Sequence, residues 1–232
     1  MSARAKSLDP VVYPSSDDMA EHELQRFIAE LLRPLIERWL RERGVVAHAG
    51  ADTFFYYAKG DTSRRFSPDV YVIDGVPQEL AVSSWKLWEG TPAPRFSFEV
   101  VSSDVLKDYD EIPAVLSRVG AYELVLFDPE APSSTSRTRR RALWTVHRRG
   151  PEGFRLVEQT DGDRVYSEAL GCFLRVVGEG PATRVRLSTG PRGDELFPTA
   201  EERAERANAQ AREAIDEVQR LRAELEALRR GR

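Results

Sequence analysis

The sequence is poor in cysteine, histidine and lysine, and each scarcity excludes a kind of site. Its single cysteine, Cys172, excludes an internal disulfide and a cysteine-rich zinc site. The three histidines are far apart and show no metal-ligand spacing. Only four of the 34 basic residues are lysines, so a lysine with a chemical role has few candidates: Lys6, Lys59, Lys86 and Lys107.

Long apolar runs are also absent. No run approaches the ~18 residues that cross a membrane, and residues 1–18 lack the apolar core of a signal peptide. We therefore expect no membrane contact and a cytoplasmic location. The net charge of −4 shows that the chain as a whole is not a basic nucleic-acid binder, so any DNA contact requires a local basic patch.

The order of predicted elements indicates three parts: an N-terminal arm (1–18), a globular domain (19–198) and a C-terminal helix (199–232). In the domain, helical spacing of apolar residues predicts a helix from about Met19 to Arg43, which Gly44 ends. Strands are predicted at 53–57, 70–73, 95–101 and 123–127, the first two as a hairpin. Asp110 is the predicted cap of a second helix. This order predicts an α/β fold with a mixed sheet.

The rest of the domain is predicted to be β-structure. Residues 143–147 and 154–159 form the expected hairpin, and further strands are expected near 172–177 and 183–187. After Thr199 the apolar positions step alternately by three and four, which is a heptad seam. We therefore expect residues 199–232 to form a coiled coil that joins two copies as a homodimer. The seam residues are Ala204, Ala207, Ala211, Ala214, Val218, Leu221, Leu225 and Leu228.

The strongest chemical signal is a pair of acids in apolar strands. Asp69 follows a proline and begins the strand in SPDVYVI, and Glu99 lies inside FSFEVV. A buried carboxylate costs several kcal/mol unless something pairs with it. Two such acids on neighbouring strands can hold one Mg²⁺ together with waters. The alternative is that Asp69 is a turn residue and that Glu99 faces solvent, and strand alternation leaves both interpretations open.

These segments resemble the Uma2-type (DUF820) endonucleases of the PD-(D/E)XK superfamily. The features that carry the resemblance occur in the family's order: Pro68–Asp69, Glu99–Ser102, Gly120–Glu123 and Asp128–Pro129. The segments at 170–176 and 193–196 and the C-terminal helix also fit, so the resemblance extends over nearly the whole chain after residue 20. It implies a restriction-endonuclease-like core with additional hairpins, with Asp69 and Glu99 as ligands of Mg²⁺ or Mn²⁺.

The sequence departs from the superfamily pattern at one catalytic position. The pattern implies a lysine two residues after the glutamate, where this chain has Val101. Residues 111–119, where many relatives carry the lysine instead, contain none. Lys107 lies just past the strand end, from where it could orient water or stabilise charge on phosphate. The alternative is a solvated lysine in a loop.

Two further groups are candidates for accessory roles. Glu21, His22 and Glu23 lie near the start of the first helix, from which superfamily members often bring an acid to the site; a surface acid is the alternative. Six arginines without an intervening acid could hold a phosphate backbone, or simply form a charged hairpin face. They are Arg137, Arg139, Arg140, Arg141, Arg148 and Arg149.

Two functions are therefore compatible with the sequence. The first is a Mg²⁺-dependent DNA endonuclease that hydrolyses phosphodiester bonds. The second is a catalytically inactive nuclease-fold module that binds DNA or assembles through its coiled coil. The absent lysine favours the second and the retained acids favour the first.

Overall fold

The computed structural model describes residues 23–131 and 141–230. The chain divides into two compact units, Met1–Leu196 and Phe197–Arg232. The helices are α1 (Glu23–Glu42), α2 (Ile112–Val119) and α3 (Ala200–Arg230), with a π-helical turn, η3, at Lys107–Glu111. Short 3-10 turns lie at Leu87–Glu89 (η2) and Gly180–Ala182 (η5). Among the described residues, no helix is long and apolar enough to cross a membrane.

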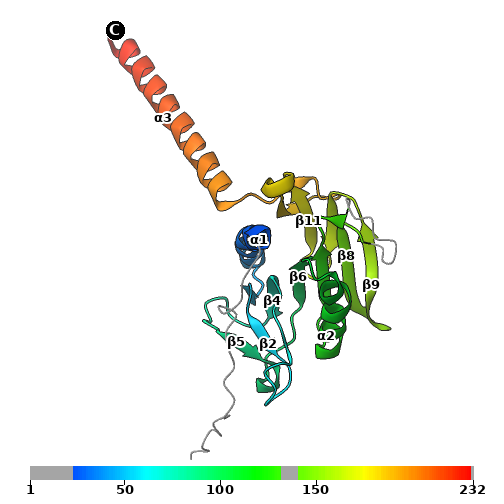
Figure 1. Ribbon diagram of the computed structural model, residues 1–232. Helices are drawn as coiled ribbons and strands as arrows, with labels where there is room; N and C mark the ends of the chain where they lie inside the picture. Colours follow the sequence, from blue (N-terminus) through cyan, green and yellow to red (C-terminus); the bar gives the residue numbers. More distant parts are fainter. Residues whose placement is uncertain (1–22, 132–140, 231–232) are drawn as a thin grey trace, which may run out of the picture. The chain divides into compact units, whose positions relative to one another are not determined.

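Three sheets make up the first unit (Figure 1). The six-stranded sheet has the order β1-β4-β6-β7-β8-β9, with β6 and β7 parallel and the other pairs antiparallel. Its strands are β1 (Ala47–Gly50), β4 (Val70–Asp74), β6 (Phe96–Val100), β7 (Glu123–Phe127), β8 (Trp144–Gly150) and β9 (Gly153–Thr160).

Two smaller sheets complete the unit. One contains β10 (Arg164–Ser167), β11 (Cys172–Val177), β12 (Arg184–Thr189) and β13 (Glu195–Leu196). The other contains β3 (Arg65–Phe66), β2 (Phe54–Tyr56) and β5 (Ser84–Lys86). The predicted α/β class with a mixed sheet, additional hairpins and a C-terminal helix is confirmed.

Two helices cover the six-stranded sheet. The apolar stripe of α1 is buried, and this helix contacts β1 and β4 as well as β12 of the neighbouring sheet. Ile112 and Leu116 of α2 pack against Leu124 and Leu126 of β7. Because α2 connects the parallel strands β6 and β7, it lies on the sheet face that carries these leucines.

Two details of the predicted fold are wrong. The predicted hairpin of residues 53–57 with 70–73 does not form: β4 pairs antiparallel with β1, whereas β2 belongs to the three-stranded sheet. The sequence of β1, AHAG, has low strand propensity. Its strand conformation depends on the pairing with β4. Asp110 does not cap α2: it lies inside the π-helical turn, and the residue before α2 is Glu111, which makes no side-chain cap.

Candidate metal and nuclease site

Asp69 and Glu99 lie opposite each other on one face of the sheet. Strands β4 and β6 pair with Val70 opposite Phe98 and Tyr71 opposite Ser97. This register, continued by one residue, places Asp69 opposite Glu99. Directly opposed residues of an antiparallel pair point to the same face with Cβ atoms about 4.5–5.5 Å apart. Glu99 also pairs with Leu126, so the two acids are on the face that α2 covers.

Both acids are buried, each with a residual exposure of 3%. Asp69 accepts hydrogen bonds from the Val100 backbone N–H at 2.6 Å and from Gln25 Nε2 at 2.5 Å. Glu99 Oε1 is buried and has no hydrogen-bond partner within the described part of the chain. A buried carboxylate oxygen without a partner is costly, so this side chain is incompletely satisfied by the protein.

The electrostatics of the pair disfavour two negative charges. Burial raises the pKa of Asp69 to about 7, although the Val100 N–H lowers it. Burial also raises the pKa of Glu99 well above its ordinary value, and the neighbouring charge of Asp69 raises it further. Strongly shifted carboxyl pKa values that arise from burial and a like charge are typical of functional sites. The arrangement is suited to a positively charged ligand.

Lys107 contributes positive charge from the turn between β6 and α2. It begins the π-helical turn η3, and its charge lowers the pKa of both Asp69 and Glu99. Its Nζ lies 3.8 Å from Asp108 Oδ1, and its side chain is 46% exposed. The charge of Lys107 therefore acts on both predicted acids, and this lysine belongs to the turn rather than to the strand; its catalytic role stays a prediction.

Three further side chains take part that the sequence interpretation missed. Gln25 hydrogen-bonds Asp69 and lies three and seven residues before the buried Ile28 and Leu32. A polar residue at this spacing lies on the buried face of the helix, so the sequence could have indicated it as a site residue. Asp108 is buried and accepts hydrogen bonds from Ser102 N at 2.6 Å and Ser102 Oγ at 2.8 Å. Asp52 has a positive φ of 49° and raises the pKa of both central acids.

The acids proposed from the first helix are not seen at the site. Glu23 is the first residue of α1 and is exposed, while Glu21 and His22 lie outside the described residues. The helix instead contributes the amide of Gln25. Within residues 23–131 and 141–230, no three His, Cys, Asp or Glu side chains are grouped so that they could hold a metal ion. A cation here would rely on the central pair.

The described arginines of the basic strip make internal contacts. Arg141 forms a two-point ion pair with buried Asp128, with nitrogen–oxygen distances of 2.6 and 2.7 Å. Arg148 pairs with buried Glu123 at 2.7 Å. Arg149 donates to the carbonyl oxygens of Ala121 and Ser117, at the end of α2. These three guanidinium groups stabilise the fold. Arg137, Arg139 and Arg140 lie outside the described residues.

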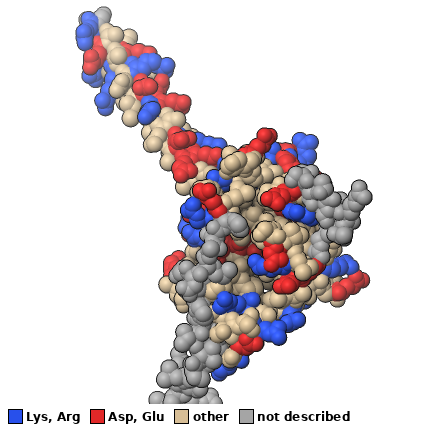
Figure 2. All heavy atoms as spheres, viewed as in Figure 1, with Lys and Arg blue, Asp and Glu red and all other residues tan. Residues whose placement is uncertain are grey.

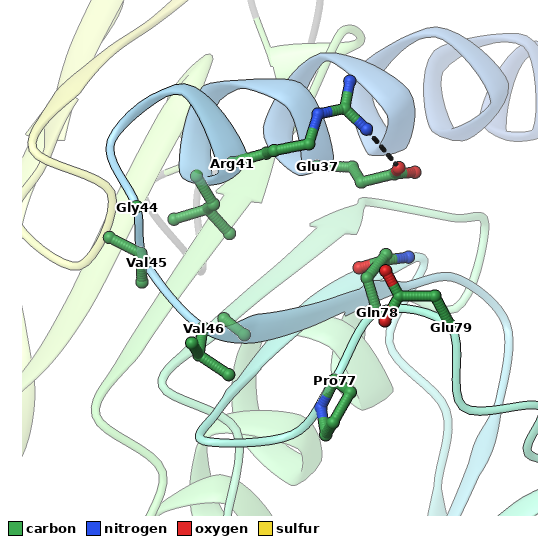
Figure 3. Close-up of a pocket in the computed structure, with 10 residues that line it drawn as sticks. Glu37, Arg41, Gly44, Val45, Val46, Pro77, Gln78 and Glu79 are labelled. Carbon is green, nitrogen blue, oxygen red and sulfur yellow. Dashed lines mark hydrogen bonds and ion pairs between the residues drawn. The ribbon is translucent and has the colours of Figure 1, made fainter.

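A separate pocket lies away from the central pair. Its volume is about 310 Å³, and it is formed by the end of α1, the start of β1 and the loop after β4 (Figure 3). Glu37 and Arg41 form an ion pair on one side, and Val46 and Pro77 lie on the other. None of the predicted site residues lines this pocket.

Comparison with known proteins identifies the family. The model of the Uma2 family, described as "Putative restriction endonuclease", matches residues 13–171. A crystal structure of a "putative nuclease belonging to DUF820" from Anabaena variabilis is similar over 66% of this chain and 76% of that chain, with 15% identity and a TM-score of 0.43. Comparison with curated proteins gives no match.

The family match includes Asp69, Glu99 and Lys107 and ends before β11. The resemblance inferred from the sequence extended further, to the C-terminal helix. It nevertheless spans more than half of the 232 residues and confirms the resemblance. The chain belongs to the Uma2 family.

Proposed function

We propose that this protein is a divalent-metal-dependent DNA endonuclease in which Asp69 and Glu99 hold Mg²⁺ or Mn²⁺. The observation that carries the proposal is the pair of buried carboxylates on one sheet face, with Glu99 Oε1 lacking a hydrogen-bond partner among the described residues. Two buried acids without a compensating cation are unfavourable. Membership of the family described as "Putative restriction endonuclease" supports the same chemistry.

The donor set fits a hard cation with few protein ligands. Mg²⁺ prefers oxygen, commonly uses one or two protein carboxylates and keeps several waters. Asp69 and Glu99 provide that number of carboxylates. A bound cation would lower the pKa of a coordinated water and shield the charge of a phosphate.

The chain's own residues orient the site and hold charge. Gln25 and the Val100 N–H fix the orientation of Asp69 through hydrogen bonds to both carboxylate oxygens. Lys107, in the turn η3, would stabilise the negative charge that develops on a phosphate oxygen. DNA contact by the strip that contains Arg137, Arg139 and Arg140 stays a prediction.

The second candidate function is a catalytically inactive relative that binds DNA or assembles through its C-terminal helix. The observation in its favour is Val101, which occupies the position where the superfamily pattern has lysine and which is buried in the apolar core. No lysine lies on α2. The two candidates therefore differ in whether Lys107 can replace the missing lysine.

Cleavage and metal binding by the wild type and an Asp69→Asn variant distinguish them. Single- and double-stranded DNA would be incubated with Mg²⁺ or Mn²⁺ at pH 8, and metal affinity measured by titration calorimetry. Asp74→Asn, at the exposed end of the same strand, is the matched control. We expect cleavage by the wild type and the control, and loss of both cleavage and metal binding in Asp69→Asn.

Two outcomes would contradict the proposal. A wild type that binds the cation but cuts neither substrate would favour the inactive relative. A wild type that binds no divalent cation would remove the metal site itself.

A further inference from the structure

The C-terminal helix α3 leaves an apolar seam uncovered. Thr199 and Glu202 form a reciprocal capping box, with Thr199 N donating to Glu202 Oε2 and Glu202 N to Thr199 Oγ1, so the start of the helix is well defined. The helix contains 31 residues and is about 46 Å long at 1.5 Å per residue. It has no buried residue, and its large apolar side chains are 47–74% exposed: Ile215, Val218, Leu221, Leu225 and Leu228.

The apolar side chains of the second half favour two strands. In heptad notation Val218 and Leu225 occupy a positions, and Leu221 and Leu228 occupy d positions. Among parallel coiled coils, a β-branched residue at a with leucine at d favours two strands, and Val218 with Leu221 fits this pattern. The first half of the seam consists of alanines, so the second half provides most of the apolar surface that a partner would bury.

Charges beside the seam have a regular order. The g positions of heptads 211–217 and 218–224 are Glu217 and Glu224, and the e positions that follow them are Arg222 and Arg229. In a parallel, in-register pair each g residue meets the e residue of the next heptad on the partner helix. Glu217 would then meet the second copy's residue 222, and Glu224 its residue 229, which makes four attractive pairs by two-fold symmetry.

An antiparallel pair reverses this complementarity. There g positions meet g positions and e positions meet e positions, so glutamates would face glutamates and arginines would face arginines. Figure 2 shows that acidic and basic side chains alternate along α3, so net charge alone does not oppose pairing. The order of the charges along the seam therefore distinguishes the two orientations.

We propose that α3 pairs with α3 of a second copy as a parallel, in-register, two-stranded coiled coil. Because α3 follows the first unit in each chain, both copies of the first unit would be joined to the N-terminal end of the parallel coiled coil. The proposal rests on the seam and its charges and is independent of the nuclease proposal.

A charge reversal at the e positions tests the pairing in the full-length chain. Arg222→Glu/Arg229→Glu would place glutamate against glutamate in the parallel pair. Neither arginine forms an ion pair with a described residue, so the change leaves the observed contacts of the single helix intact. Arg206→Glu/Arg212→Glu, at c and b positions outside the seam, changes the net charge equally and is the control.

We expect the wild type and the control to be dimers by sedimentation velocity. The Kd of the e-position variant should rise by at least roughly tenfold, since like charges replace all four attractive pairs. A monomeric wild type, or equal dimerisation of the wild type and the e-position variant, would overturn the proposal.

A full exchange of charges tests the orientation. Glu217→Arg/Glu224→Arg combined with Arg222→Glu/Arg229→Glu restores attraction in a parallel homodimer. This variant should dimerise with itself but not with an affinity-tagged wild type, because parallel mixed pairs are repulsive. Preferential formation of mixed dimers would indicate the antiparallel orientation and would contradict the proposal.

Discussion

At the scale of single residues, the central acids make the metal-free protein less stable as pH rises. The pKa of Asp69 is raised from 3.8 to about 7, so folding favours its protonated form. The stability contributed by this group is fully present below about pH 4 and is lost as pH rises through about 7. Glu99 shifts in the same direction. A cation bound to both acids would reverse this loss by stabilising their charged forms.

Asp69→Asn should therefore stabilise the metal-free protein at alkaline pH. Asparagine is uncharged and of similar shape, and the Gln25 amide can turn to match it. In EDTA at pH 8 we expect the free energy of unfolding to exceed that of the wild type by about 2–4 kcal/mol, with little difference near pH 4. Urea unfolding at several pH values is the measurement. A wild type whose stability does not fall between pH 4 and 8 relative to the variant would contradict the assigned pKa shift.

At the scale of elements, the π-helical turn between β6 and α2 determines the position of Lys107. Helical turns of this kind occur frequently at functional sites. The turn places Lys107 near both acids, whereas Val101 on the preceding segment is part of the apolar core. Ser102 and Asp108 fix the turn by two hydrogen bonds. Under the proposed function, Lys107 in this turn would replace the strand lysine of the superfamily pattern.

Lys107→Ala should remove cleavage and leave metal binding intact. Loss of a group that stabilises charge in the transition state costs about 3–4 kcal/mol, or a rate factor on the order of a hundred to a thousand. Metal affinity should be unchanged or slightly higher, because a positive charge near the acids is removed. Single-turnover cleavage and titration calorimetry provide the two measurements. Lys59→Ala, in an exposed loop, is the control; a Lys107→Ala rate within a few-fold of wild type would exclude this role.

At the scale of the whole molecule, the first unit and the C-terminal helix have different sources of stability. The first unit has its own apolar core, whereas α3 buries none of its side chains and gains helix stability from its cap and from ion pairs such as Arg220–Glu217. A helix of this kind depends on a partner for further stability. The oligomeric state should therefore depend on α3.

A chain ending at Pro198 should be a smaller species than the full-length protein. We expect light scattering to give a monomer for the shortened chain and a dimer for the full chain, because removal of α3 removes the seam. A near-ultraviolet circular dichroism spectrum that keeps its aromatic signals would show that the first unit is still folded. If both proteins have the same oligomeric state, another surface joins the copies.

The sequence by itself determined the elements whose patterns are local. Helical spacing identified α1 and α3, and apolar runs identified β4, β6 and β7. The acids just before β4 and inside β6 indicated Asp69 and Glu99 as candidates. The family was recognisable because its motifs occur in a fixed order along the chain. These features depend on neighbouring residues or on short spacings, which a sequence displays directly.

The tertiary structure alone decided which residues share the site. Whether Glu99 faced solvent or a covered face depended on the register of β4 and β6 and on the packing of α2. Gln25 reaches Asp69 from 44 residues away, and β1 becomes a strand only because β4 pairs with it. Of the arginines that looked available for phosphate, the three described ones, Arg141, Arg148 and Arg149, contact buried acids and carbonyl oxygens instead. Each outcome depends on contacts between distant segments, which no local spacing specifies.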